Sequence, residues 1–269
     1  MSQPLPLRTR LIRRLLNHVK MGSFETRLRV GALRRPDYAT CLYYAALQAK
    51  RLGYSAMTAV ELGVAGGRGL LSLCEHAAAI QKELGIEFVI AGFDAGSGLP
   101  ESNDPRDLKY YWNAGAFPMD LQALQARLAG RAELILGNVA DTCPSWTPPA
   151  HAPLGMIAFD LDLYSSTAAA LTLLEKENVL PRIWCCFDDL MDLPQSSLTG
   201  FVGVAAAIRD FNEMPKRKLL QDNLSPARVF AECPVEWWHG KIHIYHRFTH
   251  PQYNMPAYVR GDAEQLKLK

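Results

Sequence analysis

Residues 56–67 have the sequence AMTAVELGVAGG, and this segment indicates the fold class. Its first part, Ala56–Leu62, is an apolar and partly β-branched run, which predicts a buried strand. Glycines at Gly63, Gly66 and Gly67 interrupt that run, and a helix is expected from about Leu70 to Leu84. A strand, a glycine-rich turn and a helix in this order begin an α/β unit. Because glycine has no Cβ, a ligand can approach the backbone of this turn closely. We refer to Glu61–Gly67 as the glycine loop.

The rest of the chain continues the alternation of strands and helices. Further strands are expected at 87–93, 132–136, 156–159, 183–187 and 241–248, and further helices at 38–52, 120–128, 166–175 and 202–211. This order predicts an α/β protein with a Rossmann-like, doubly wound and mostly parallel sheet. We divide the chain into a helical N-terminal extension, residues 1–55, and one domain, residues 56–269.

Charge is distributed unevenly along the 269 residues. The net charge is +2, but residues 1–35 hold nine Lys and Arg against one acid (9 − 1 = +8), and the remainder carries 20 − 26 = −6.

Residues 5–20 show helical periodicity, with apolar side chains at Leu7, Leu11, Ile12, Leu15, Leu16 and Val19. We expect this basic amphipathic helix to pack on its own domain or on a second subunit, which makes a homodimer plausible. Peripheral contact with an anionic membrane, nucleic-acid binding and a transit peptide are the alternatives.

Cysteines and apolar runs bear on the compartment. The six cysteines show no C-x-x-C spacing, and the adjacent Cys185 and Cys186 would point to opposite faces of a strand. We therefore expect reduced, mostly buried thiols and a cytoplasmic protein. No apolar run is long enough to span a membrane, and the N-terminus lacks the continuous apolar region of a secretory signal.

Polar residues follow the strands where a ligand would bind. Asp94 ends the second strand, where an acid can hydrogen-bond the hydroxyls of a ribose. Asn138 follows the third strand, and we weigh a contact with an adenine equally against an ordinary turn residue. The long segment Ala95–Met119 carries Tyr110, Tyr111, Trp112 and Phe117, and its length favours a lid over the site. We call it the aromatic loop.

Acidic residues follow the two next strands. Asp160 and Asp162 come after one strand, and Asp188 and Asp189 come after its expected neighbour. Adjacent strands lie about 4.8 Å apart, so their carboxyl ends should bring Asp160, Asp188 and Asp189 together. Carboxylates this close repel one another unless a cation offsets them, and oxygen ligands suit Mg²⁺. The alternative is a set of helix caps and solvated turn acids.

These motifs resemble known enzymes. The glycine loop with Asp94 resembles class I S-adenosylmethionine (SAM)-dependent methyltransferases. The run from Asp160 to Thr167, followed by Asp188 and Asp189, looks like the macrocin O-methyltransferase family. The resemblance covers about residues 36–250 and implies a seven-stranded sheet, SAM as methyl donor and a Mg²⁺ ion. It implies catalytic roles for Asp160 and Asp188, metal ligation by Asp160, Asp188 and Asp189, and cofactor binding by Glu61, Gly63, Val64, Ala65, Gly67, Asp94, Asn138 and Asp160.

We therefore expect a Mg²⁺-dependent O-methyltransferase that acts on a hydroxyl of a small molecule, such as a sugar or a natural product, and does not bind nucleic acid. Catechol-type enzymes carry a lysine shortly after the first metal-ligand Asp. Here Asp160 is followed by Leu161-Asp162-Leu163-Tyr164, so the resemblance assigns no general base. Two alternatives remain: a cephalosporin-hydroxylase-like metal enzyme of the same fold, and a non-catalytic α/β module that docks through its basic N-terminal helix.

Overall fold

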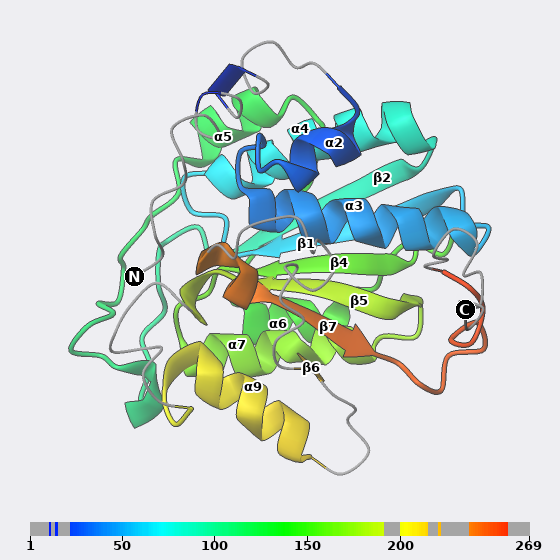
Figure 1. Ribbon diagram of the computed structural model, residues 1–269. Helices are drawn as coiled ribbons and strands as arrows, with labels where there is room; N and C mark the ends of the chain where they lie inside the picture. Colours follow the sequence, from blue (N-terminus) through cyan, green and yellow to red (C-terminus); the bar gives the residue numbers. More distant parts are fainter. Residues whose placement is uncertain are drawn as a thin grey trace.

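The computed structural model describes residues 11, 14–15, 22–190, 200–214, 220–221 and 237–257. Within these residues, seven strands form one sheet in the order β3-β2-β1-β4-β5-β7-β6 (Figure 1). Strands β1 to β5 run parallel, and β7 pairs antiparallel with both β5 and β6. The predicted seven-stranded, mostly parallel sheet is thus confirmed. The strands are β1 (Ala56–Leu62), β2 (Glu87–Asp94), β3 (Glu133–Leu136), β4 (Leu154–Phe159), β5 (Val179–Phe187), β6 (Leu220–Gln221) and β7 (Ile242–His246).

Helices cover both faces of the sheet. One face carries α2 (Phe24–Arg29), α3 (Pro36–Arg51), α4 (Arg68–Leu84) and α5 (Leu121–Leu128), and the other carries α6 (Val139–Ser145), α7 (Tyr164–Ala170) and α9 (Gly203–Glu213) (Figure 1). Four short 3-10 helices, η1 (Pro105–Asp107), η2 (Leu171–Glu175), η3 (Asp188–Leu190) and η4 (Trp237–Lys241), complete the described elements. The order of the strands reverses between β1 and β4, and ligands bind at such a switch point in open α/β sheets.

Alternating side chains of the strands build two separate apolar cores. In β5, Trp184 and Cys186 face the α3–α4 side, whereas Ile183 and Cys185 face the α6–α7 side. The expectation that the two adjacent cysteines point apart is confirmed. Cys41, Cys74, Cys143, Cys185 and Cys186 are all free and buried. Burial raises the pKa of each of these thiols, so they are protonated and unreactive near neutral pH.

Two α-helices and one strand were not expected from the sequence, and neither were the short helices η1, η3 and η4. Helix α2 is only six residues long and begins at the Ser23 cap, and α6 is seven residues long with Pro144 inside it. Such short segments show too few turns for a helical period to emerge. Strand β6 has two residues and is defined by its pairing with β7. The helix expected at 166–175 is divided into α7 and η2.

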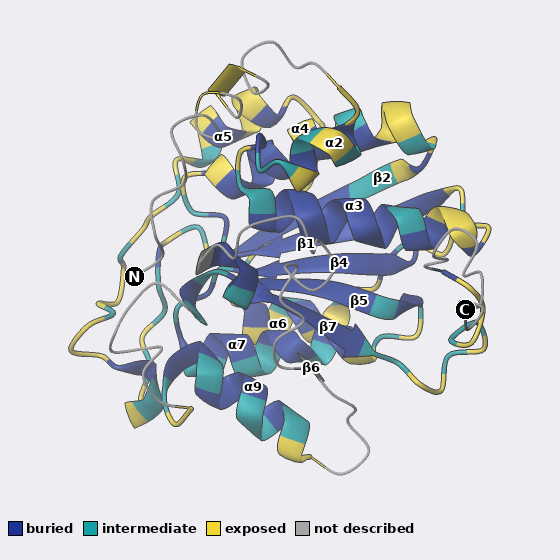
Figure 2. Cartoon of the chain, in the orientation of Figure 1, coloured by how far each residue is buried: buried dark blue, intermediate teal, exposed yellow. Residues whose placement is uncertain are grey.

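Helix α3 lies in the centre of its layer. Twelve of its sixteen residues are buried, and it packs on β1, β4 and β5 (Figure 2). It belongs to the core of the same unit as the sheet, and the predicted division of the chain at residue 55 stays a prediction.

The structure describes three residues of the basic segment 5–20, namely Leu11, Arg14 and Leu15, which are helical and exposed. The rest of that segment lies outside the described residues, as does Cys233. None of the described helices combines the length and apolar character needed to cross a bilayer.

Candidate active site

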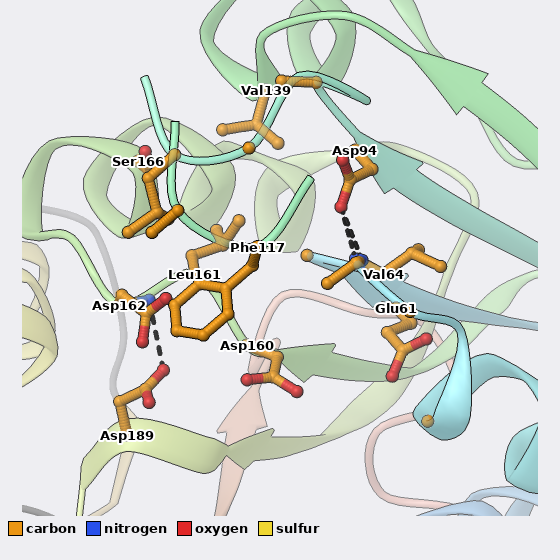
Figure 3. Close-up of a pocket in the computed structure, with 18 of the residues that line it drawn as sticks. Glu61, Val64, Asp94, Phe117, Val139, Asp160, Leu161, Asp162, Ser166 and Asp189 are labelled. Atoms are coloured by element: carbon orange, nitrogen blue, oxygen red, sulfur yellow. Dashed lines mark hydrogen bonds between the residues drawn. The ribbon is translucent and has the colours of Figure 1, made fainter. Parts of the chain in front are cut away.

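A cavity of about 480 Å³ lies at the carboxyl ends of β1, β2 and β4 (Figure 3). This volume is typical of small-molecule sites. It contains most of the predicted site residues, because the strands that precede them are adjacent and parallel. The predicted residues that line it are Glu61, Gly63, Val64, Ala65, Asp94, Asn138, Asp160 and Asp189. Gly67 and Asp188 are not among the described lining residues.

The glycine loop is held by Asp94 at the end of β2. Its Oδ2 accepts hydrogen bonds from the backbone N–H groups of Val64 and Ala65, both at 2.8 Å, and its Oδ1 accepts one from Gly96 at 2.6 Å (Figure 3). Oδ2 uses both of its lone pairs in these bonds and Oδ1 uses one, so a ligand hydroxyl can still donate to Oδ1. Asp94 therefore shapes the loop and also faces the cavity.

Two glycines of the loop have different structural roles. Gly63 has φ +84°, and a Cβ there would lie 1.8 Å from the Asp160 carbonyl oxygen. Only glycine allows β1 and β4 to approach this closely where both strands end. Gly67 has φ +79° and its Cα faces Leu124 of α5, where a Cβ would lie 2.2 Å from a methyl group. Packing between α4 and α5 thus accounts for Gly67, and its predicted contact with the cofactor stays a prediction.

Glu61 is a buried carboxylate with one oxygen available. It is 1% exposed, and its Oε1 accepts a hydrogen bond from the Tyr38 hydroxyl at 2.9 Å. Its Oε2 is buried and has no hydrogen-bond partner among the described residues. Burial, and secondarily the charge of Asp160, raises the pKa of Glu61 well above its usual range. A buried acceptor without a partner is costly, so this oxygen is suited to a donor group of a bound ligand.

Asp160, Asp188 and Asp189 form one group, which we call the acidic cluster. Each offers a carboxylate oxygen, and these oxygens lie within 4.8 Å of one another. Burial and the neighbouring carboxylates raise the pKa of Asp160, while burial and Asp162 raise that of Asp189. Burial also raises the pKa of Asp162, to about 6, and its backbone N–H donates to Asp189 Oδ2 at 3.1 Å (Figure 3). The predicted convergence of the three acids is confirmed as geometry.

Two cations enter the acidic cluster from distant parts of the chain. Arg35 Nη2 lies 2.9 Å from Asp188 Oδ1 and 3.5 Å from Asp160 Oδ2. Lys241 Nζ lies 3.1 Å from the same Asp188 oxygen. The sequence predicts neither residue for the site, and Arg35 lies in residues 1–55, the predicted N-terminal extension. Its only distinctive local feature is the following Pro36, so no motif pointed to it.

The donors of the acidic cluster fit a divalent cation such as Mg²⁺. All are carboxylate oxygens, which this ion prefers, and the three carboxylates outnumber the two cations, Arg35 and Lys241, that contact them. Both cations engage the same oxygen of Asp188, its Oδ1. The residues present are therefore compatible with a metal ion.

The aromatic loop crosses the cavity and is fastened at its middle. Asp107, 1% exposed, accepts hydrogen bonds from the backbone N–H of Ser165 at 2.8 Å and from its hydroxyl at 2.7 Å. Arg106 lies 3.5 Å above the ring of Tyr164. Beyond this attachment, Trp112 and Phe117 line the cavity, and the Phe117 ring projects into it beside Leu161 (Figure 3). Asn138 also lines the cavity, and its side chain caps α6 through the N–H of Ala140.

Comparisons with known proteins identify the fold. Neither a family model nor a curated protein sequence matches the chain. Among solved structures, the calicheamicin methyltransferase CalS11 is 19% identical, covers 92% of this chain and 94% of its own, and gives a TM-score of 0.50. The O-methyltransferase TomG from Streptomyces achromogenes, solved with SAM, is 16% identical over 78% of each chain with a TM-score of 0.39. An O-methyltransferase from Bacillus cereus, solved with S-adenosylhomocysteine (SAH), is 13% identical over 77% of this chain and 87% of its own, also at 0.39.

We base the fold comparison on the calicheamicin enzyme, because its TM-score is the higher and the alignment spans nearly all of both chains. At this identity the similarity concerns the fold. The chain has the Rossmann-like fold of class I SAM-dependent methyltransferases, as the sequence predicted.

Proposed function

We propose that the chain is a SAM-dependent O-methyltransferase that acts on a hydroxyl of a small molecule. One observation carries this proposal: most of the glycine loop, with its buried Glu61, and Asp160 and Asp189 of the acidic cluster line a single cavity at the switch point of a methyltransferase fold. A donor site and an acceptor site must meet in such an enzyme, because methyl transfer needs the two reacting atoms in line and in contact.

The cofactor would be held by the residues of the glycine-loop side. The unpartnered Oε2 of Glu61 can accept a hydrogen bond from a cationic ammonium, and the remaining lone pair of Asp94 Oδ1 can accept one from a ribose hydroxyl. Gly63, Val64 and Ala65 bring backbone close to the ligand, and Asn138 lies at the same wall of the cavity. When bound, SAM supplies an activated methyl group, and these residues orient it.

The metal would be held by Asp160, Asp188 and Asp189. When bound, Mg²⁺ lowers the pKa of a ligating hydroxyl and so replaces a strong general base. This is consistent with the absence of a lysine directly after Asp160. Asp160 lines the cavity, and Asp188, which shares the Arg35 guanidinium with it, would complete the ligand set, which gives these two residues the catalytic part of the proposal.

The acceptor is proposed to be a sugar or a natural product. Trp112 and Phe117 give the cavity an apolar wall, and the buried indole N–H of Trp112 has no hydrogen-bond partner among the described residues. Such a wall suits a ring with few polar groups on one face. The attachment of the aromatic loop at Asp107 supports its proposed role as a lid.

We also infer a cytoplasmic enzyme, because its five described cysteines are free. A homodimer, or peripheral membrane contact, through residues 5–20 is consistent with the exposed Leu11 and Leu15.

Calorimetric titration with SAM and with SAH, each with and without Mg²⁺, tests the proposal directly. We expect both ligands to bind, since the donor side does not depend on the acceptor. No heat with either ligand would refute the methyltransferase assignment. Incubation of candidate acceptors with a methyl-labelled donor then separates methyl transfer from hydroxylation, because only the former adds the labelled mass.

A further inference from the structure

Arg35 occupies a position that a divalent cation would also favour. Its guanidinium lies 2.9 Å from Asp188 Oδ1 and 3.5 Å from Asp160 Oδ2, and both residues belong to the acidic cluster. A cation held between these carboxylates would be a few ångströms from the guanidinium. Two positive groups at that distance repel each other, most strongly where water is scarce.

The backbone presents Arg35 to the site in a fixed way. Arg35 is the N-cap of α3, with φ 41° and ψ 67°, and it precedes Pro36. The left-handed region is uncommon for a residue with a side chain, so the surrounding structure must hold it there. The carbonyl of Arg34 accepts a hydrogen bond from His76 Nε2 of α4 at 2.8 Å, which anchors the preceding residue. The base of the side chain is thus fixed.

The guanidinium at the end of the side chain, in contrast, has a second contact besides the carboxylates. The guanidinium carbon lies 4.1 Å from the centre of the Tyr38 ring, and the side chain is 27% exposed where it lines the cavity. Contact with an aromatic face stabilises a guanidinium independently of a carboxylate. Arg35 can therefore leave Asp188 without losing all of its favourable contacts.

Lys241 provides the internal contrast. It contacts the same Asp188 oxygen at 3.1 Å, but its side chain is 1% exposed and it does not line the cavity among the described residues. A fully buried ammonium cannot leave its carboxylate without a large desolvation cost. Lys241 is thus a permanent partner of Asp188, whereas Arg35 is a displaceable one.

We propose that Arg35 competes with a divalent cation for the acidic cluster, so that the cation binds only when the guanidinium withdraws from Asp188 and Asp160. Arg35 thereby lowers the affinity of the cluster for metal and holds the two carboxylates in place until the ion arrives. This inference rests on the proposed function, because it takes the acidic cluster as the cation site.

Titration of Mn²⁺ into the full chain, followed by electron paramagnetic resonance, tests this competition without an acceptor. Mn²⁺ prefers the same oxygen ligands as Mg²⁺. We expect Arg35→Gln to bind Mn²⁺ at least about tenfold more tightly than the wild type, because it removes the competing charge. Arg35→Lys keeps a charge and should stay closer to the wild type. Arg34→Gln is the matched control, since it removes the neighbouring, exposed arginine and should leave Mn²⁺ affinity unchanged.

Equal or weaker Mn²⁺ binding by Arg35→Gln, or no binding by any of the proteins, would overturn the inference. Thermal unfolding of each variant shows whether Arg35→Gln is folded. If Arg35→Gln does not fold, Arg35→Lys is compared with the wild type instead. Weaker Mn²⁺ binding by Arg35→Lys than by the wild type would then contradict the competition. SAH titrations on the same samples separate the two proposals. SAH binding by the wild type without any effect of Arg35 on Mn²⁺ would refute the competition alone, whereas loss of SAH binding by the wild type would refute the methyltransferase assignment.

Discussion

The glycine-loop side of the cavity and its acidic side differ in how their carboxylates are held. Asp94 is fixed by three backbone N–H groups that lie within 30 residues of it in the sequence. Asp188 is fixed by side-chain cations from Arg35 and Lys241, which lie 153 and 53 residues away. Backbone donors cannot leave, while a side-chain cation such as Arg35 can. The first arrangement suits a site that always binds one ligand, and the second suits one whose charge balance changes.

The largest expected effect comes from the glycine that joins the two sides. Gly63→Ala should lower the free energy of unfolding by about 4 kcal/mol or abolish folding, because its Cβ would meet the Asp160 carbonyl at 1.8 Å in a left-handed conformation. Urea denaturation measures the change. Gly66→Ala is the matched control, since a Cβ there has no atom within 4 Å, and should alter stability by less than about 1 kcal/mol. Equal stability of the two variants would show that Gly63 does not join β1 and β4 as described.

The second largest effect is expected on stability and SAH affinity when Asp94, the carboxylate held by backbone N–H groups, is replaced. Asp94→Ala leaves three N–H groups without their acceptor, which should cost about 2–3 kcal/mol of stability. It should also weaken SAH binding by about 100-fold, measured by calorimetry, because the loop loses its shape. Asp120→Ala removes an exposed helix cap that accepts from Ala123 and should not change SAH affinity. Wild-type SAH affinity in Asp94→Ala would exclude Asp94 from the donor site.

A smaller effect, on Mn²⁺ affinity, is expected when Asp188, the carboxylate held by side-chain cations, is replaced. Asp188→Asn should weaken Mn²⁺ binding by about tenfold, since it removes one anionic ligand, and should leave SAH affinity within about threefold. Asp210→Asn is the control, because Asp210 pairs with Arg106 and Arg209 outside the acidic cluster. If Asp188→Asn changed SAH affinity more than Mn²⁺ affinity, the division of the cavity into two sides would fail.

The smallest effect is a pH dependence at the segment that presents Arg35. Burial lowers the pKa of His76 to about 4, although the hydrogen bond to the Arg34 carbonyl favours the charged ring. Between about pH 6.5 and 4, the unfolded chain therefore binds a proton at His76 that the folded chain does not bind. The contribution of His76 to stability is thus fully present above pH 6.5 and is lost as the pH falls towards 4. Between pH 6.5 and about pH 5 the wild type should lose about 1.5 kcal/mol more than His76→Gln, measured by denaturation at each pH. Parallel pH profiles would show that His76 does not titrate in this way.

Local patterns were sufficient for most of the fold. The predicted strand at Ala56–Leu62 agrees with β1 at both ends, and the predicted helices at 120–128 and 202–211 agree with α5 and α9 within two residues. β1 is a mostly apolar run that stops before Gly63, α5 begins at its capping Asp120, and α9 has an apolar helical period, so neighbours in the sequence specify them. α2, α6 and β6 were missed because each is too short to show a period.

The candidate site divides in the same way. The amino-acid order alone predicts which acids and glycines follow each strand, and the order of parallel strands then places Asp94, Asp160 and Asp189 at one edge of the sheet. The entry of Arg35 and Lys241 into the acidic cluster, and the hydrogen bond from Tyr38 to Glu61, depend on packing between remote segments. The backbone sets where a strand ends, but the side chain that neutralises a buried charge there depends on how the helices α3 and η4 pack against that end of the sheet.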